Sequence, residues 1–261
     1  MKQLACVLAA LCMLLLAGCG GEPEIEMIWE LEAQDVLTLS NGESVGRWRS
    51  HTAGSDSTPA DYVDYRLADG TVLLREFDPQ GPAIPEGTLD EAVQKTIEIW
   101  HQEQGLRYDR DALLRETGRL SQEQGNHFSA WTVQQTVQLT ALSERTVWGE
   151  TEVQQQDEWF CYSAVFDRAT GEPLSLWKLF SVSEDRAKNA LLSTVSDEDP
   201  RKTAMREALT PERVTFCPDH ASVYYPVGSL PGEEMPVRVD VPMNELAAVL
   251  RNWAVPQETG A

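Results

Sequence analysis

Residues 131 to 141, Trp-Thr-Val-Gln-Gln-Thr-Val-Gln-Leu-Thr-Ala, alternate between two kinds of side chain. Every second residue from Trp131 to Ala141 is apolar except Gln135, and every residue between them is Thr or Gln. Because successive side chains of a strand point to opposite faces, this pattern gives one apolar and one polar face. It predicts a long strand of an antiparallel sheet with one side in water.

Two further strands are predicted directly after this one. Residues 145 to 156 alternate in a similar way. Residues 158 to 167, Glu-Trp-Phe-Cys-Tyr-Ser-Ala-Val-Phe-Asp, are apolar at almost every interior position, which is typical of a central strand buried on both faces. The three segments together predict a meander of antiparallel strands.

Two hairpins are predicted nearer the N-terminus. The dipeptides Asn41-Gly42 and Asp69-Gly70 favour tight turns, because these residues adopt the positive φ angles that two-residue hairpin loops require. Short candidate strands flank both turns, at residues 36–39 and 46–50 for the first and at residues 62–67 and 72–77 for the second.

Two helices are predicted between the hairpins and the meander. Thr88 and Glu91 form a capping box, and apolar residues at helical spacing follow as far as Gln104. A shorter helix is predicted over residues 109 to 116, with Asp109 as its N-cap and Gly118 as its stop.

The segment after the meander mixes helices with short strands. Ser181 and Glu184 form a second capping box at the start of a helix, and residues 201 to 209 predict another helix. The remaining predicted elements are strands at 214–217, 222–225 and 237–241 and a terminal amphipathic helix at 243–253. Strands and helices are grouped rather than alternating, so the predicted class is α+β: an antiparallel meander sheet packed with a few helices, preceded by a smaller β/α part.

The first twenty residues are typical of a secretion signal. Lys2 precedes an apolar run from Leu4 to Ala17, which is too short for a permanent membrane helix. The run ends in Leu16-Ala17-Gly18-Cys19, which resembles a bacterial lipobox. The resemblance implies cleavage after Gly18 and lipidation of Cys19, so the predicted partner at this end is a lipid bilayer on the extracytoplasmic side.

Four parts of the chain follow from these patterns. Residues 1–18 form the signal peptide, and residues 19–35 an acidic tether whose glutamates repel one another. Residues 36–125 form the N-terminal hairpin and helix region. Residues 128–256 form the C-terminal α+β domain.

The charge of the chain excludes one class of partner and favours another. The 261 residues include 21 basic and 42 acidic side chains, a formal net charge of -21. Binding a nucleic acid duplex requires a basic surface, so nucleic acid is excluded as a partner. A cationic envelope protein is electrostatically compatible, and cell-wall glycan is a further candidate.

Cys161 and Cys217 are the cysteines that remain after Cys19 in the mature chain. Outside the cytoplasm a disulfide between them is permitted. The alternative is two buried thiols that act as small apolar side chains. Sequence spacing leaves both alternatives open, because it does not fix the distance between two residues in the fold.

A family resemblance is carried by short segments in the C-terminal half. They comprise Val165-Phe-Asp-Arg-Ala-Thr-Gly171, Leu174-Ser-Leu-Trp-Lys-Leu-Phe180, Val214-Thr-Phe216, Asp219-His220, Ser222-Val-Tyr-Tyr-Pro226 and Val237-Arg-Val-Asp-Val-Pro-Met-Asn-Glu-Leu246. Together these segments resemble an uncharacterised extracytoplasmic domain. That domain forms the ectodomain of a lysozyme-sensing anti-sigma factor and accompanies some peptidoglycan deacetylases.

The resemblance covers residues 128 to 252, and residues 85 to 99 more weakly resemble a helix of the companion N-terminal domain. It implies an extracytoplasmic α+β domain and carries no catalytic motif. Many members have Gly-Gly-Ala-His before the central strand, where this chain has Gln154-Gln155-Gln156-Asp157. No ligand residue is therefore carried over from that stretch.

Motifs of catalysis and metal binding are missing from the sequence. His51, His101, His127 and His220 form no i, i+4 pair, and no H-E-x-x-H, C-x-x-C or G-x-S-x-G spacing occurs. The sequence therefore predicts no catalytic residue, metal ligand or cofactor. Acidic residues near 56–64 and 197–199 are expected to be solvated surface rather than calcium ligands.

Two other side-chain types leave alternatives open. Carboxylates brought together only by folding could form a hydrolase pair, so a cell-wall hydrolase stays an alternative. Tryptophans could form a glycan-binding face. We expect Trp100, Trp131, Trp159 and Trp177 in the core and Trp29, Trp48, Trp148 and Trp253 as the freer ones.

Together these observations favour a membrane-anchored extracytoplasmic lipoprotein that binds or senses a ligand at the cell envelope without catalysis. The alternatives are the carboxylate-pair hydrolase and a structural envelope lipoprotein. A concave pocket with convergent carboxylates of raised pKa would favour the hydrolase. A broad flat patch would favour the structural role.

Overall fold

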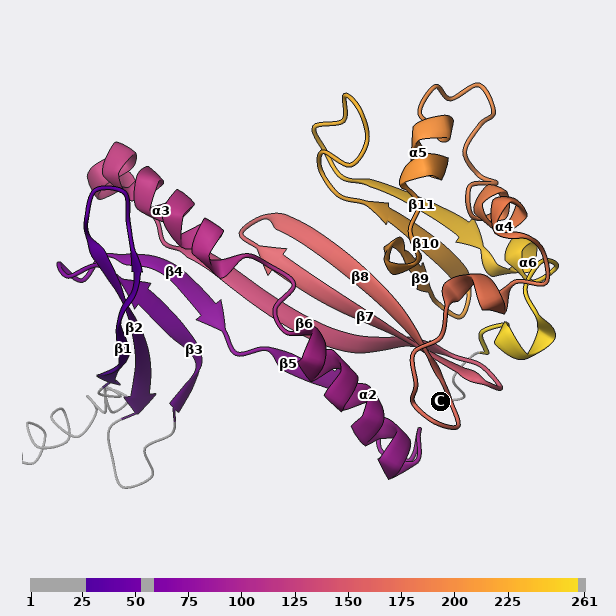
Figure 1. The fold of residues 1–261 in the computed structure, drawn as a ribbon, viewed down its shortest axis with the longest axis horizontal. Coiled ribbons are helices and arrows are strands. Elements are labelled where there is room, and N and C mark those ends of the chain that lie inside the picture. The colour runs from indigo at the N-terminus through magenta and orange to yellow at the C-terminus, as the bar shows by residue number, and fades with distance from the viewer. Residues whose placement is uncertain (1–26, 53–58, 258–261) are drawn as a thin grey trace, which may run out of the picture.

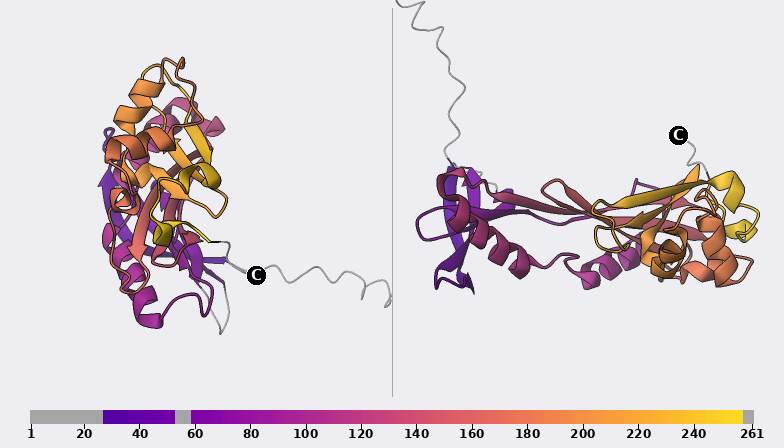
Figure 2. Two further views of the ribbon diagram at one scale, coloured as in Figure 1. Left: turned by 90° about the vertical axis from the view of Figure 1, so that its right-hand side faces the viewer. Right: turned by 90° about the horizontal axis from the view of Figure 1, so that it is seen from above.

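The computed structural model describes residues 27–52 and 59–257 of the 261-residue chain. These residues form an elongated molecule with a large sheet along its length and a small sheet at one end (Figures 1 and 2). The predicted α+β class is confirmed. No helix in this part of the chain combines the length and the apolar character needed to cross a bilayer.

The large sheet has eight strands in the order β1-β2-β3-β4-β6-β7-β8, with β5 also paired to β6. Its pairs are antiparallel except β4 with β6 and β5 with β6, which are parallel. Parallel neighbours require a crossover connection, and here helices α2 and α3 supply it. The strands are β1 (Met27–Thr38), β2 (Ser44–Thr52), β3 (Pro59–Arg66), β4 (Val72–Phe77), β5 (Gln80–Ala83), β6 (Trp131–Leu142), β7 (Thr146–Gln155) and β8 (Glu158–Asp167).

Both predicted hairpins are present. Gly42 and Gly70 have φ angles of 89° and 91°, which the turns between β1 and β2 and between β3 and β4 require. Strand β1 is longer than predicted, because residues 27 to 35, expected in the acidic tether, pair with β2.

Helices α2 (Glu91–Gln104) and α3 (Arg110–Gln124) lie along one face of the large sheet (Figure 1). Ile97 of α2 is buried in a cluster that contains Val147 of β7 and Phe166 of β8. Leu114 of α3 is buried with Leu74 and other residues of β3, β4, β6 and β7. The two helices thus cover the apolar face that the alternation predicted.

The ends of these helices differ in part from the prediction. Asp109 caps α3 as predicted, by accepting a hydrogen bond from the Ala112 N–H. Helix α2 starts at Glu91, with Asp90 as its N-cap in place of Thr88, because the Asp90 carboxylate accepts the Ala92 N–H. Gly118 does not stop α3. A Cβ at that position would lie 2.6 Å from Leu39 Cδ1, so this glycine permits close packing inside the helix.

Strand β8 lies at the edge of the large sheet, not at its centre as predicted. Its apolar run has another cause. Phe166 faces α2, whereas Val165 packs with Trp148 in the core beneath the small sheet. Both faces of the edge strand are therefore partly covered.

The small sheet contains β9 (Val214–Phe216), β10 (His220–Tyr225) and β11 (Val237–Pro242) in the order β11-β10-β9. Its apolar side packs with helices α4 (Glu184–Leu191), α5 (Lys202–Ala208) and α6 (Met243–Leu246). Ser183, not Ser181, precedes α4 as its N-cap. The terminal helix predicted over 243–253 ends at Leu246, and Leu250 instead bridges to Phe180.

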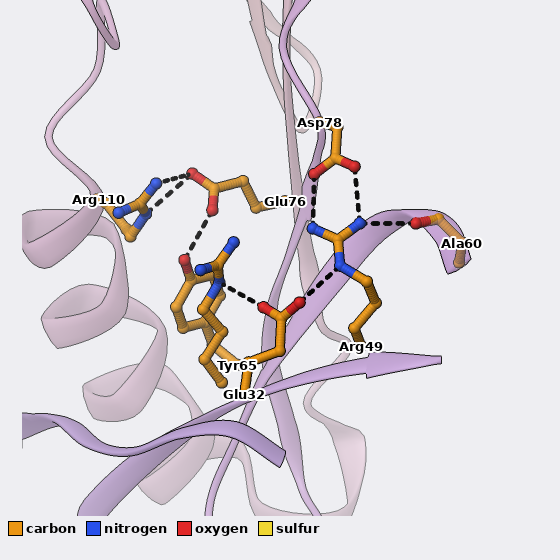
Figure 3. A network of polar contacts seen from close by, with 8 residues as sticks. Glu32, Arg49, Ala60, Tyr65, Glu76, Asp78 and Arg110 are labelled. Atoms are coloured by element: carbon orange, nitrogen blue, oxygen red, sulfur yellow. Dashed lines mark hydrogen bonds and ion pairs between the residues drawn. The ribbon is translucent and has the colours of Figure 1, made fainter. Parts of the chain in front are cut away.

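Ion pairs connect the N-terminal strands with one another and with α3 (Figure 3). Arg49 of β2 donates to Asp78, to Glu32 of β1 and to the Ala60 carbonyl of β3 at 2.6 to 2.9 Å. Glu76 of β4 accepts hydrogen bonds from Arg110 at the start of α3. These contacts hold strands β1 to β4 together and fix β4 against the start of α3.

Candidate functional site

The residues that the sequence singled out fall in two places. Gly18 and Cys19 lie outside the described residues. Cys161 lies on β8, and Cys217 follows β9, where its N–H donates to the His220 carbonyl. Both cysteines are free thiols in the structure.

A hollow of about 400 Å³ lies between α2, β5 and β6. Pro79, Pro82, Leu106 and Val137 supply apolar walls, and the polar groups that line it include Glu98. Concave, mostly apolar sites of roughly 300 to 1,000 Å³ with a few polar groups are typical of ligand pockets. No pattern in the sequence indicates this hollow, because it depends on the parallel pairing of β5 with β6.

Gln135 fixes the end of the hollow near the α2–α3 loop. Its Oε1 accepts the Arg107 N–H at 2.8 Å, and its Nε2 donates to the Gly105 carbonyl at 3.0 Å. This is the one polar residue on the apolar side of the β6 alternation. Its position therefore has a physical reason, since it satisfies backbone groups of the loop.

His101 of α2 lines the same hollow and is 8% exposed. Its ring packs edge-on against Trp100 and Phe166. Its Nε2 has no hydrogen-bond partner among the described residues and lies near Gly149 of β7. Burial, with a smaller effect of the Arg107 charge, lowers the pKa of His101 to about 4, so the ring is neutral at pH 7.

The outer side of α2 carries three acidic side chains and one basic side chain, Lys95. Glu91, Glu98 and Glu103 have no ion-pair partner within residues 27–52 and 59–257, although the Gln94 amide donates to Glu98. Ile99, between Glu98 and Glu103, is 44% exposed. An acidic surface with an apolar residue thus borders the hollow, because Glu98 belongs to both.

A second polar cluster lies where the small sheet meets the large sheet. Glu150 and Glu152 of β7 point to the same face, and Cys161 lies opposite Glu152 on β8. One oxygen of each carboxylate and the Cys161 Sγ all lie within 4.8 Å of one another. The Thr215 hydroxyl of β9 donates to Glu150 and lies 2.5 Å from Ser163 Oγ.

The electrostatics of this cluster are unfavourable for negative charge. Burial, with the charge of Glu150, raises the pKa of Glu152. Burial, with the charges of both glutamates, raises the pKa of the Cys161 thiol to about 12. Burial, with Glu150, also raises the pKa of Cys217. Both thiols are therefore protonated at neutral pH and unreactive as nucleophiles.

Glu150 and Glu152 are close enough to be compared with the carboxylate pair of a hydrolase, since one oxygen of each lies within 4.8 Å of the other. Neither residue lines the hollow described above, so the two carboxylates do not converge on that pocket.

Charged groups on the small sheet are already paired. Arg238 of β11 donates to Asp240 and to Ser222 Oγ, both at 2.8 Å. His220 Nδ1 lies 2.7 Å from Asp219 Oδ1. This network leaves the Arg238 guanidinium engaged with its own sheet.

Two of the expectations for tryptophan are wrong. Trp148, expected to be among the freer ones, is 1% exposed and stacks on Phe216. Trp159, expected in the core, is 45% exposed. Its place one residue after the start of β8, beside the hairpin turn, is the signal that could have indicated this exposure.

No family model and no curated protein matches the chain. One similar solved structure is a member of the DUF3298 family from Bacteroides fragilis NCTC 9343. It has 12% identity and a TM-score of 0.44, and the match covers 70% of this chain and 87% of that one. Another is a DUF3298 family protein from Pseudomonas aeruginosa PAO1. It has 10% identity and a TM-score of 0.33, and the match covers 91% of this chain and 99% of that one. Both are similar to this chain in the arrangement of their elements only.

Proposed function

We propose that this protein is a lipid-anchored, extracytoplasmic module that binds a cationic ligand in the hollow beside α2 and does not catalyse a reaction. The Leu16-Ala17-Gly18-Cys19 sequence supports the anchor. The resemblance of residues 128 to 252 to extracytoplasmic sensor and accessory domains supports the location and a role in recognition.

One observation carries the binding role: the carboxylate of Glu98 lines a hollow with apolar walls and forms no ion pair among the described residues, although Lys95 is on the same helix. An ammonium or guanidinium group on an apolar stem matches both properties. The stem would cover Pro79, Pro82 and Val137, and the charge would meet Glu98.

The side chains of α2 around the hollow would also suit a larger partner that is both basic and apolar. Glu91 and Glu103 add negative charge along α2, where Lys95 is the one lysine, and Ile99 offers an exposed apolar contact. A basic, amphipathic surface of an envelope protein therefore fits better than a single small amine. The net charge of -21 would speed the encounter at low salt.

The anchor is tested in the full chain by Cys19→Ala. We expect the wild-type protein in the membrane fraction, from which only detergent should release it. The variant should carry no lipid. It should either keep its uncleaved signal peptide or be absent from the membrane fraction. A wild-type protein without a mass increase from acyl chains would contradict the anchor.

Binding is tested with the chain from residue 20 onwards, which contains every described residue. It is used to capture proteins from envelope extract at low and at high salt. We expect a basic protein that is captured at low salt, is released at high salt and is captured less by a Glu98→Gln variant. Equal capture by wild type and by Glu98→Gln would contradict the role of the hollow.

A further inference from the structure

A second site lies on the opposite side of β7 and β8 from α2, and it is independent of the proposed hollow. Its groups are Glu150, Glu152 and Cys161. Glu152 and Cys161 are cross-strand partners, and Glu150 is two residues along β7 on the same face. Hydrogen-bonded strands, not a loop, therefore set the spacing of the three side chains.

The two carboxylates form no ion pair in the described part of the chain. There Glu150 accepts hydrogen bonds from neutral donors, the Thr215 hydroxyl and the Gln138 amide at 3.4 Å. Glu152 has no hydrogen bond to its carboxylate within the same residues. The charge of Arg238 reaches both Cys161 and Glu150, but its guanidinium is bonded to Asp240 and Ser222. Half-buried carboxylates this close together favour the uptake of a cation.

We infer that Glu150, Glu152 and Cys161 form a site for a divalent cation of the zinc class. The thiol decides the class, because Mg²⁺ and Ca²⁺ prefer oxygen ligands whereas Zn²⁺ binds both sulfur and carboxylate oxygen. Ligand atoms around one tetrahedral zinc ion lie about 3.3 to 3.8 Å apart. Atoms already within 4.8 Å reach that spacing by small side-chain rotations.

Zinc binding at this site would release one proton. The Cys161 S–H bond breaks, the sulfur electron pair forms the bond to zinc, and the proton leaves to solvent. The two glutamates bind as carboxylates. Zinc affinity is therefore expected to rise with pH, and three protein ligands leave a fourth position for water.

The test uses the chain from residue 20 onwards, so that Cys161 and Cys217 are its only thiols. Zinc binding is measured by equilibrium dialysis for wild type, Cys161→Ser, Glu152→Gln and two controls. The controls are Cys217→Ser, which removes the other thiol, and Glu158→Gln, which removes a carboxylate of the same hairpin. Circular dichroism checks that each variant is folded.

We expect one zinc ion per wild-type chain and per control chain, and at least about tenfold weaker binding by Cys161→Ser and Glu152→Gln. Cobalt provides a second measurement, because a thiolate ligand adds a sulfur-to-cobalt charge-transfer band. This band should appear in wild type and in Cys217→Ser. Wild type that binds no zinc, wild type that lacks the cobalt band, or undiminished zinc binding by Cys161→Ser would overturn the assignment. Loss of zinc from Cys217→Ser would overturn it as well.

Discussion

The carboxylate of Glu76 and the guanidinium of Arg110 form an ion pair of 2.7 Å in which the Glu76 side chain is only 4% exposed. The same carboxylate accepts hydrogen bonds from the hydroxyls of Tyr65 and Tyr108 at 2.7 and 2.6 Å. Burial, with these bonds, raises the pKa of both tyrosines. Glu76 therefore joins β4 to the start of α3 through four hydrogen bonds, three to Oε1 and one to Oε2.

Replacing this carboxylate should destabilise the fold strongly. Glu76→Ala leaves a guanidinium and two hydroxyls without their acceptor, and breaking a buried pair costs about 3 to 5 kcal/mol. Urea unfolding measures the loss. The control is Glu116→Gln, which removes an exposed i, i+3 partner of Arg119 and should change stability little. A Glu76→Ala variant as stable as this control would contradict the role of the network.

Gly171 and Gly228 separate a backbone effect from a packing effect. Both have φ of +76°, but a Cβ on Gly171 would lie 2.7 Å from the Val93 carbonyl oxygen of α2, and a Cβ on Gly228 would have open space. Alanine in the left-handed region costs about 1 to 2 kcal/mol at either position. We expect Gly171→Ala to lower the melting temperature clearly more than Gly228→Ala. Equal decreases in melting temperature would show that the Thr170-Gly171 turn is not packed tightly against α2.

His101 should make stability depend on pH. Its pKa is about 4 in the folded chain and 6.5 in the unfolded chain, so between these values only the unfolded chain takes up the proton. Stability therefore falls as the pH drops from 7 towards 4, by up to about 3 kcal/mol from this group. Urea unfolding of wild type and His101→Gln at several pH values isolates the effect. Parallel profiles of the two proteins would contradict the buried, neutral ring.

Local patterns predicted much of the fold. The alternation of β6 and the dipeptides Asn41-Gly42 and Asp69-Gly70 depend on neighbouring residues only, and each is present as predicted. The errors arise where distant residues decide. Gly118 looks like a helix stop until Leu39 packs against it, and β8 looks central because two different layers cover an edge strand.

The candidate sites were harder to predict from the sequence than the fold. Glu98 has no distinguishing neighbours along the chain, and its hollow exists because β5 runs beside β6. Glu152 and Cys161 could have been found. A hairpin closed at Gln156 and Asp157 places these two residues opposite each other, and counting outwards from the turn gives that register.

The central claim is that the hollow beside α2 binds a cationic, amphipathic ligand, and a calorimetric titration tests it most directly. The chain from residue 20 onwards is titrated with a lysine-leucine helical peptide and with its glutamate-leucine counterpart. Glu98→Gln is compared with Glu234→Gln, a control away from α2. We predict saturable binding of the lysine peptide only, weakened about tenfold or more by Glu98→Gln and unchanged by Glu234→Gln. Equal affinity of wild type and both variants for the lysine peptide would contradict the claim.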